Sequence, residues 1–344
     1  MNSPKSMIGA LVPPRPPLSK NERLIVGVSG GSDSVALLHL LIQQLPQAVH
    51  RLVVAHINYG LRGRESKKDE AVLSALCRQW DVPLRVLRLK KFKFEAQSKN
   101  RSIQDWARER RYSFFAKLTL KEKAWGVTVA HHQEDQAETI LDRLLRGAGT
   151  RGLTGLKPVQ KLQVLKPPFT LRVWRPLLNY SKRDLQAYLQ SFKINWREDQ
   201  SNHENHYRRN QIRNQIIPYL ARWNPRISEN LARMGEVSGA EDLFLQEALE
   251  KFQKTLRNHW RRSTYSGLSL GFTAIPLALQ RRWVRQVAEK LNPDARGLSF
   301  DRIEDTVRVW NGSKKGPRHI GYGLVADQKN PHFLMTFHSK KAKN

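Results

Sequence analysis

The chain has 344 residues, and its 60 lysines and arginines against 30 aspartates and glutamates give a formal net charge of +30 at pH 7. This excess indicates a polyanionic partner, nucleic acid before an anionic membrane, because no long apolar run is present. The one cysteine, Cys77, excludes an internal disulfide and a zinc site made only of cysteines, and it permits a reducing compartment such as the cytoplasm.

The first residues of the chain are basic and rich in proline. Residues 1–20 contain five prolines and no acidic residue, and they lack the apolar core of a secretory signal peptide. We therefore expect residues 1–21 to form a flexible basic leader, and a role in organelle targeting stays open.

Strand-like and helix-like segments alternate in the first half of the chain. Aliphatic and β-branched runs predict strands at 24–28, 51–57, 85–89 and 126–131. Helices are predicted after them, at 35–45, 66–80, 102–118 and 135–146. Ser66 and Asp69 form a capping-box pattern at the start of the second helix. The alternation predicts an α/β fold with a parallel sheet, in which ligands bind at the carboxyl ends of the strands.

The pattern changes in the second half of the chain. Glycines punctuate residues 147–168, which predicts a loop, before strand-like and helix-like segments return over 171–192. Later helical patterns cover 227–256, 274–291 and 299–310, and a β-like segment covers 318–337. We expect a catalytic domain over 22–220 and a smaller, mainly helical domain over 221–344.

The loop after the first strand has the composition of an anion-binding turn. Its residues are Ser29, Gly30, Gly31, Ser32, Asp33 and Ser34. Two glycines before a helix let backbone N–H groups approach a phosphate, and the serine hydroxyls add donors. The loop lacks the lysine of a Walker A motif and the glycine spacing of a dinucleotide fingerprint. Asp33 predicts a nearby Mg²⁺ or a polarised donor network, and the alternative is a plain turn in which Asp33 caps the helix.

Charged residues follow at two further positions that face the same end of the predicted sheet. Arg108 and Arg111 share one side of a helix, where the alternative is a solvated arginine face. His131 directly follows a strand, and Asp135 and Glu138 lie on one side of the next helix. Acids in a first helical turn also serve as ordinary partners of the helix dipole, so this reading stays open too.

Two other segments are candidates for nucleotide or RNA contact. In the segment 56–63, His56 and Asn58 are expected to border the adenosine and Arg62 to meet RNA, unless this is an ordinary loop. The segment 207–226 contains five arginines and no acid, so it is suited to phosphate binding. Three aromatic residues are interleaved with these arginines and either stack on bases or belong to the core: Tyr207, Tyr219 and Trp223.

These motifs resemble a known family. Residues 29–34 resemble the PP-loop of N-type ATP pyrophosphatases, whose fold is that of the adenine nucleotide alpha hydrolases. With the segments 56–63, 130–149, 175–178 and 198–220 the chain resembles the tRNA(Ile)-lysidine synthases. The resemblance implies a cytoplasmic ligase that joins free L-lysine to C2 of the wobble cytidine, position 34, of the CAU-anticodon tRNA(Ile). ATP and Mg²⁺ are the implied cofactors, and AMP and pyrophosphate are the implied products.

The resemblance also implies site residues, which are Asp33, Arg111, His131, Asp135, Glu138 and Arg209, with His56 and residues 29–34 at the nucleotide. Adenylation of the cytosine oxygen needs cations around the phosphates. The later attack needs an uncharged lysine amine, which titrates near pH ~10.4, so a carboxylate that grips and deprotonates it is useful. His131 either moves a proton or contacts phosphate, and His132 is expected to be structural. The C-terminal domain is expected to bind tRNA.

Other functions remain as alternatives. A PP-loop tRNA thiolase is disfavoured because such enzymes rely on paired cysteines or a cluster, and the chain has one cysteine. A non-catalytic tRNA-binding protein is disfavoured by the intact acids and histidine, and a small-molecule amidotransferase leaves the charge of +30 unexplained. The sequence does not predict the oligomeric state, the tRNA elements that are recognised or the number of metal ions.

Overall fold

The computed structural model describes residues 18–19, 22–45, 48–60, 63–89, 102–165, 167–197, 208–255, 258–261, 263–329 and 331–338. Most of the predicted leader, Arg62 and Tyr207 lie outside these residues. The chain forms two compact units, residues 1–239 and 240–344, and the division falls inside helix α12 (Ile227–Thr255). The domain limits at residues 21 and 220 stay predictions.

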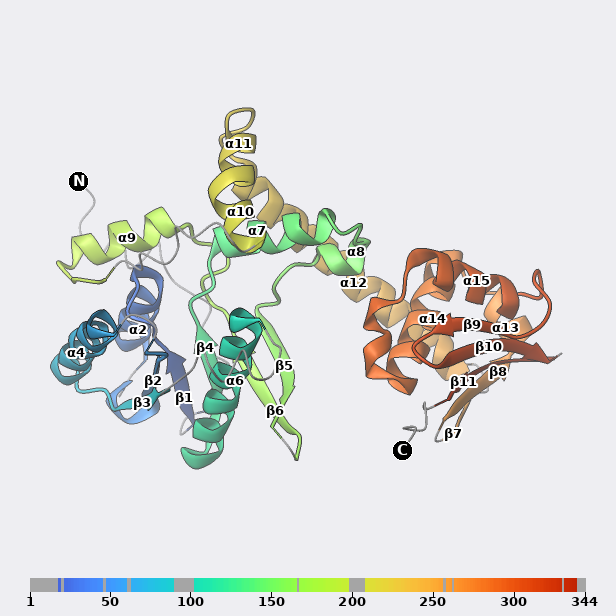
Figure 1. Ribbon diagram of the computed structural model, residues 1–344, viewed down its shortest axis with the longest axis horizontal. Helices are drawn as coiled ribbons and strands as arrows, with labels where there is room; N and C mark the ends of the chain where they lie inside the picture. The colour runs from blue at the N-terminus through green and yellow to red at the C-terminus, as the bar shows by residue number, and fades with distance from the viewer. Residues whose placement is uncertain are drawn as a thin grey trace. The chain divides into compact units, whose positions relative to one another are not determined.

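The first unit is built on a six-stranded sheet with the order β3-β2-β1-β4-β6-β5. All neighbouring pairs are parallel except β5 with β6 (Figure 1). The strands are β1 (Arg23–Gly27), β2 (Leu52–Asn58), β3 (Leu84–Arg88), β4 (Ala124–Val129), β5 (Val159–Val164) and β6 (Phe169–Trp174). Leu24, Ile25 and Val26 of β1 are all fully buried, as expected for a central parallel strand covered on both faces.

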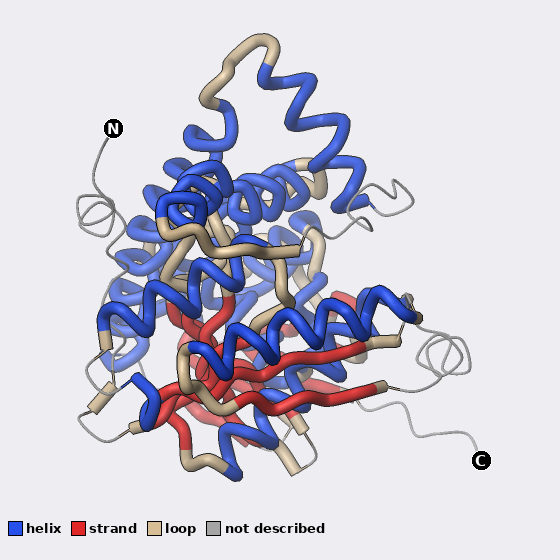
Figure 2. The backbone as a smooth tube through the Cα atoms, turned by 90° about the vertical axis from the view of Figure 1, so that its left-hand side faces the viewer, coloured by secondary structure: helices blue, strands red, loops and turns tan. Residues whose placement is uncertain are grey.

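Helices cover both faces of this sheet (Figure 2). One core cluster joins the sheet to α2 (Ser32–Gln44), α4 (Arg64–Gln79) and α9 (Lys182–Ser191). The other joins it to α6 (Ile103–Lys121), whose Phe115 packs so closely on Gly27 that an added Cβ would lie 2.8 Å from its ring. The short helix α3 (Ala48–Arg51) leads into β2.

A separate helical cluster lies above the strand ends. It joins α7 (Gln133–Leu144) and α8 (Thr150–Leu153) to the arginine-rich segment, which consists of α10 (Arg208–Gln211), a π-helical turn (Ile212–Ile216) and α11 (Ile217–Ala221) (Figure 1). Ile212 is buried against Ala137 and Ile140 of α7. This packing holds the arginines of the segment over the acids of α7.

The second unit has its own core. Its antiparallel sheet has the order β7-β8-β11-β10-β9, formed by β7 (Asn258–Arg261), β8 (Thr264–Leu268), β9 (Arg318–Gly321), β10 (Leu324–Lys329) and β11 (His332–Phe337). Beside it lie α13 (Ser269–Thr273), α14 (Leu277–Leu291), a 3₁₀ turn (Pro293–Gly297) and α15 (Phe300–Trp310). Buried aromatic residues hold the layers together, and the Trp283 indole donates a hydrogen bond to the Tyr265 hydroxyl at 2.8 Å.

The expected fold class is confirmed, and the strands and helices of the first half lie within a few residues of their predicted limits. Two expectations are wrong, and two strands were missed. The helix predicted to begin at Ser66 begins at Arg64, and Asp69 pairs with Arg197 at 2.6 Å instead of completing a capping box. The predicted loop 147–168 contains α8 and β5, and strands β7 and β8 were not predicted.

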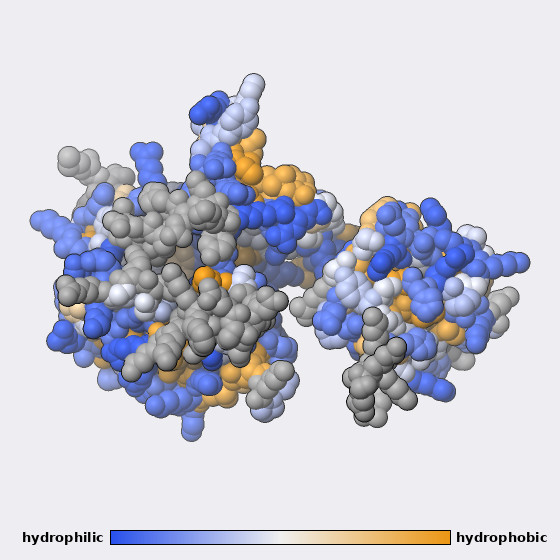
Figure 3. Space-filling view, in the orientation of Figure 1, coloured by the Kyte–Doolittle hydropathy of each residue, from blue (hydrophilic) through white to orange (hydrophobic). Residues whose placement is uncertain are grey.

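The described helices give no sign of a membrane span, since none combines sufficient length with sufficient apolar character. The visible surface of the described residues is mainly hydrophilic, with scattered apolar patches (Figure 3).

Candidate active site

The loop between β1 and α2 is braced by its own side chains. Gly30 has a positive φ of 100°, and Gly31 is the N-cap of α2. The Ser34 hydroxyl accepts hydrogen bonds from the backbone N–H groups of Ser29, at 3.1 Å, and Gly30, at 3.2 Å. It donates in turn to the Gly31 carbonyl at 2.9 Å. Ser34 therefore fixes the turn, while the first N–H groups of α2 have no acceptor inside the helix.

A cavity of about 780 Å³ opens beside this loop. It lies at the carboxyl ends of the parallel strands, where the fold class places ligands. Residues from six segments of the sequence line it, and they include Ser29, Ser32, Asp33, Ser34, Arg108, Arg111, His131, His132, Asp135, Glu138, Lys182, Arg197, Arg209 and Arg213. The structure thus brings the glycine loop, the α6 arginines and the α7 acids around one space.

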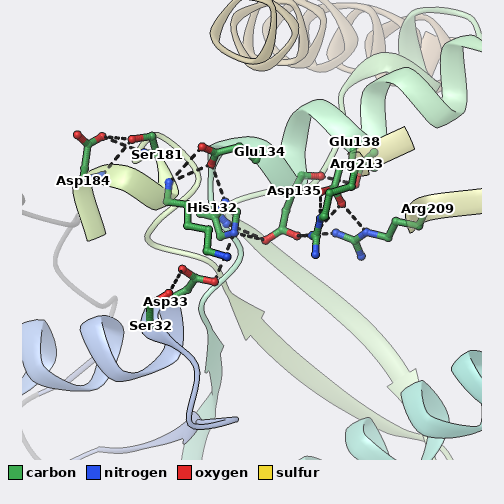
Figure 4. Close-up of polar contacts among 12 residues, drawn as sticks. Ser32, Asp33, His132, Glu134, Asp135, Glu138, Ser181, Asp184, Arg209 and Arg213 are labelled. Atoms are coloured by element: carbon green, nitrogen blue, oxygen red, sulfur yellow. Dashed lines mark hydrogen bonds and ion pairs between the residues drawn. The ribbon is translucent and has the colours of Figure 1, made fainter. Parts of the chain in front are cut away.

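His132 connects the glycine loop to helix α7 (Figure 4). Its Nε2 lies 3.5 Å from carboxylate oxygens of both Asp33 and Asp135, and its Nδ1 lies 2.8 Å from Glu134. Burial alone would lower the pKa of this imidazole. Hydrogen bonds to Asp33 and Glu134, with the charge of Asp135, instead raise that pKa to about 10. His132 is therefore an imidazolium at neutral pH that links the glycine loop to helix α7.

Two acids of α7 pair with two arginines (Figure 4). Arg209 donates to Asp135 at 2.6 Å and to Glu138 at 2.7 Å. Arg213 donates to Asp135 at 3.2 Å and forms two hydrogen bonds with Glu138, which is only 1% exposed. The two carboxylates and two guanidiniums form a compact network of opposite charges.

Charge keeps Asp135 ionised in this network. Burial alone would raise its pKa, but the neighbouring His132 and the two arginines lower it to about 2. One Asp135 oxygen also accepts a hydrogen bond from the backbone N–H of His132 at 3.1 Å, which caps α7. An ionised, fixed carboxylate of this kind is suited to hold a cationic group.

His131 differs from its neighbour. Its Nδ1 accepts a hydrogen bond from Nε of Arg175 at 3.2 Å. Burial and the positive charges of Arg175, Arg209 and Arg111 lower its pKa to about 3, although Asp135 opposes them. His131 is therefore a neutral ring on the cavity wall.

The α6 arginines also reach the cavity. Arg111 and Arg108 both line it from exposed positions on α6. Their guanidiniums lie 5.8 Å and 4.9 Å, respectively, from the centre of the buried Tyr112 ring. Both are therefore placed to meet an anion in the cavity, and not Arg111 alone.

Some predicted residues lie elsewhere. His56 is buried and does not line the cavity, because its Nδ1 is bonded to the Val28 carbonyl at 2.9 Å. The Asn58 amide donates to Glu70 and to the Ser66 carbonyl of α4, and its oxygen accepts from the Gly60 backbone N–H. Arg62 and Tyr207 lie outside the described residues. Tyr219 and Trp223 are 56% and 80% exposed, so the alternative that they belong to the core is wrong.

Sequence reasoning did not select four residues that line or support the site. Arg213 was visible as the partner of Arg209 four residues away, and Arg175 belongs to the RPLL segment 175–178. Lys182 begins α9 and had no distinguishing pattern. The backbone N–H of Arg197 donates to the Gly30 carbonyl at 3.1 Å, a contact that only the folded chain reveals.

The chain is similar in sequence to curated tRNA(Ile)-lysidine synthases. A tRNA(Ile)-lysidine synthase from Geobacter sulfurreducens is 35% identical over 303 residues, which cover 87% of this chain and 62% of the relative. One from Porphyromonas gingivalis strain W83 is 38% identical over 290 residues, 82% of this chain and 60% of the relative. The chain spans about three fifths of the length of these curated relatives.

Solved structures share the fold. A U34-tRNA thiolase from Methanococcus maripaludis, solved with its [4Fe-4S] cluster, superposes with a TM-score of 0.52 at 16% identity. The match covers 68% of this chain and 77% of the thiolase chain. The model of the PP-loop domain matches residues 5–220, more than half of the sequence, so the chain belongs to the PP-loop domain family.

Proposed function

We propose that this protein is a tRNA(Ile)-lysidine synthase, which uses ATP to attach free lysine to C2 of the wobble cytidine of a CAU-anticodon tRNA(Ile). The observation that carries the proposal is one cavity shared by the braced glycine loop and the acid–arginine network of α7. The relatives of 35% and 38% identity bear the same name and support it. A reduced cytoplasm is the compartment in which tRNA and a free thiol fit best.

The first half-reaction belongs at the glycine loop. ATP would place its phosphates against the N-terminus of α2, where N–H groups and the helix dipole favour negative charge. Arg108 and Arg111 face the same cavity and would stabilise charge as the cytosine O2 attacks the α-phosphate and pyrophosphate leaves.

A magnesium ion is part of the proposal. Among the described residues, no group of three or more His, Cys, Asp or Glu side chains is arranged to bind a metal alone. Mg²⁺ commonly binds through one or two carboxylates and the phosphates of the substrate, which fits the single carboxylate of Asp33 on the cavity wall. The ion would neutralise phosphate charge there.

The second half-reaction belongs at α7. Asp135 and Glu138 offer an ammonium group two carboxylates, and in this structure Arg209 and Arg213 occupy them. Lysine would therefore exchange for part of a guanidinium contact when it binds. Its ε-amine, once uncharged, attacks C2 of the adenylated cytosine, AMP leaves, and a carboxylate is the group suited to receive the proton.

The segment that carries Arg209 and Arg213 is also suited to RNA. Beyond the π-helical turn, Tyr219 and Trp223 are exposed, and the Arg222 guanidinium lies 5.9 Å from the Tyr219 ring centre. Exposed rings stack on unpaired bases and arginines hold phosphates. The net charge of +30 adds long-range attraction for tRNA.

The thiolase alternative has little support. The thiolase with a similar fold contains a [4Fe-4S] cluster, whereas this chain has only Cys77. That thiol is buried, and burial raises its pKa to about 12, so it is a poor thiolate donor.

The decisive experiment combines the full chain with ATP, radiolabelled lysine and unmodified CAU-anticodon tRNA(Ile). Lysine label on the RNA with equal release of AMP is expected. The matched control is the same tRNA with uridine at position 34, which should take no label. Tight tRNA binding without AMP release would show a binding protein instead, and label from cysteine sulfur would show a thiolase.

Asp33→Ala separates catalysis from RNA binding. We expect this variant to lose AMP formation and to keep nearly all of its tRNA affinity, because Asp33 faces the nucleotide end of the cavity. Equal loss of both properties would show that Asp33 supports the fold.

A further inference from the structure

Two roles for His131 were open from the sequence, proton transfer or phosphate contact, and one buried contact distinguishes them. Arg175 follows β6, is 2% exposed, and donates from Nε to Nδ1 of His131 at 3.2 Å. A guanidinium has donors and no acceptor, so Nδ1 must hold the lone pair. The ring proton of a neutral His131 is then on Nε2.

The guanidinium of Arg175 is itself held in place from the β5–β6 region. Its Nη1 donates to the Lys157 carbonyl at 2.9 Å, and its Nη2 donates to the Gln160 side chain at 3.0 Å. The Arg175 backbone N–H donates to the Pro158 carbonyl at 2.8 Å. With this many fixed partners, Arg175 cannot rotate to suit a second tautomer of His131.

The surroundings also exclude a charged His131. A doubly protonated ring would turn an N–H toward the N–H of Arg175 and lose the hydrogen bond. Burial and the nearby guanidiniums also favour the neutral ring, and although the charge of Asp135 opposes them they lower its pKa to about 3. At neutral pH the ring therefore offers one N–H donor and no free lone pair.

We propose that Arg175 is a positioning residue that holds His131 in the neutral Nε2–H tautomer, so that His131 donates a hydrogen bond to a phosphate oxygen of the bound nucleotide. This inference rests on the proposed function for its chemical meaning. A fixed donor of this kind stabilises charge as pyrophosphate departs. His131 then has no site for the proton of the lysine amine, so a group other than His131 receives that proton.

The tautomer can be measured without any substrate. The full chain, labelled with ¹⁵N on its histidine rings, is compared by long-range ¹H–¹⁵N NMR with His131→Gln to assign the His131 signals. We expect the Nε2–H pattern in the wild-type protein, unchanged between pH 5 and pH 8, and its loss in Arg175→Met. An Nδ1–H pattern or a charged ring in the wild type would overturn the inference, whether or not the protein makes lysidine.

A substitution at a partner of Arg175 tests the same role without the risk that an Arg175 variant misfolds. Gln160→Leu removes one hydrogen-bond partner of the Arg175 guanidinium. It should lower kcat by roughly tenfold and leave the KM for lysine unchanged. This loss is smaller than that caused by removing a whole oxyanion donor. Its control is Gln163→Leu on the same strand, whose amide bonds to Thr170 and not to Arg175. Equal kcat in these two variants would count against a positioning role.

Substitution of His131 gives the last readout. Because the amide of Gln can donate but cannot accept a proton as a base, His131→Gln should keep at least tenfold more activity than His131→Ala. Equal inactivity of these two variants, with both folded, would restore proton transfer as the role of His131.

Discussion

Two neighbouring strand–helix pairs, β1–α2 and β4–α7, have the same backbone arrangement but differ in the side chains of their turns. In each, a parallel strand leads through a short turn into a helix whose N-terminus faces the cavity. The turn before α2 is made of glycine and serine, and Ser34 braces it. The turn before α7 contains two histidines, and the carboxylate of Asp135 caps the helix.

The difference shows that a helix N-terminus does not by itself make an anion site. The start of α2 keeps N–H groups for a phosphate, whereas α7 satisfies one of its own with Asp135 and then gathers arginines around its acids. In the proposed function, the start of α2 binds the triphosphate and the acids of α7 bind the ammonium group of lysine. His132 ties the two together through Asp33 and Asp135.

The largest expected effect comes from removing a charge on α7. Asp135→Asn should lower the rate of lysine transfer on the order of 10³-fold, because it weakens both the ammonium site and the arginine network. Single-turnover transfer of labelled lysine measures this loss. Asp142→Asn is the control, since Asp142 lies on the same helix and pairs with Arg146 and Arg208 outside the cavity. Comparable losses in both variants would mean that any acid of α7 suffices.

A buried histidine on α2 should make the stability of the protein depend on pH. His39 is buried and its hydrogen-bond partners among the described residues are Tyr188 and Gln43, and burial lowers its pKa to about 4 from an ordinary value near 6.5. Between these values the unfolded chain binds a proton that the folded chain does not, so stability falls as the pH drops from about 6.5 to about 4.

The contribution of His39 should reach about 3 kcal/mol across that interval, at roughly 1.4 kcal/mol per pKa unit. Urea unfolding at a series of pH values measures it, with His39→Gln as the variant that should flatten the curve. A wild-type curve that matches the variant would show that His39 titrates normally in the folded protein.

A glycine substitution tests the turn before α2. Gly30→Ala should cost about 1–3 kcal/mol of unfolding free energy and weaken ATP binding, because Gly30 has a φ of 100° that alanine adopts only with strain. Gly31→Ala is the control for stability, since Gly31 has an ordinary φ of −74° and an added Cβ there would meet no atom closer than 3.7 Å. The same loss of stability in both would mean that the backbone of this turn is not specialised.

The smallest effect is expected at the exposed end of the segment that packs on α7. Trp223→Leu should weaken tRNA binding by about 1 kcal/mol, the lower end for loss of one stacked base, while Trp223→Phe should keep most of the affinity. Filter binding at fixed salt compares the two. Identical affinities would assign this surface a role other than stacking, and would leave phosphate contacts to carry RNA binding on this side.

Much of the fold could be predicted because its signals are local. The apolar centre of strand β1 and the buried helix α2 indicate their secondary structure in the sequence, and the glycine loop between them indicates the position of a site. Strands β7 and β8 escaped prediction because Asn258, Ser266 and Gly267 are poor strand formers. These segments form strands because β7 pairs with β8 and β8 pairs with β11, and the local sequence pattern does not reveal such pairing.

The sequence predicted many of the residues in the site but not the contacts that these residues make with one another. Asp135, Glu138 and Arg209 were selected from spacing and resemblance, and the structure brings them into one network. The contacts of Arg175 with His131 and of Arg197 with Gly30 join segments more than 40 residues apart. Such contacts depend on strand order and loop path, so the sequence alone could not assign them.

The π-helical turn at Ile212–Ile216 determines the direction in which the side chains after it point, relative to those before it. Arg209 and Arg213 lie at or before this turn and meet α7, whereas Tyr219 and Trp223 lie beyond it and remain exposed. Loss of one residue from the turn would rotate everything downstream by about 100° about the helix axis. Homologues with a deletion here would need a different offset between the arginines that meet α7 and the exposed aromatic residues, so this length is a criterion for recognising chains with the same arrangement.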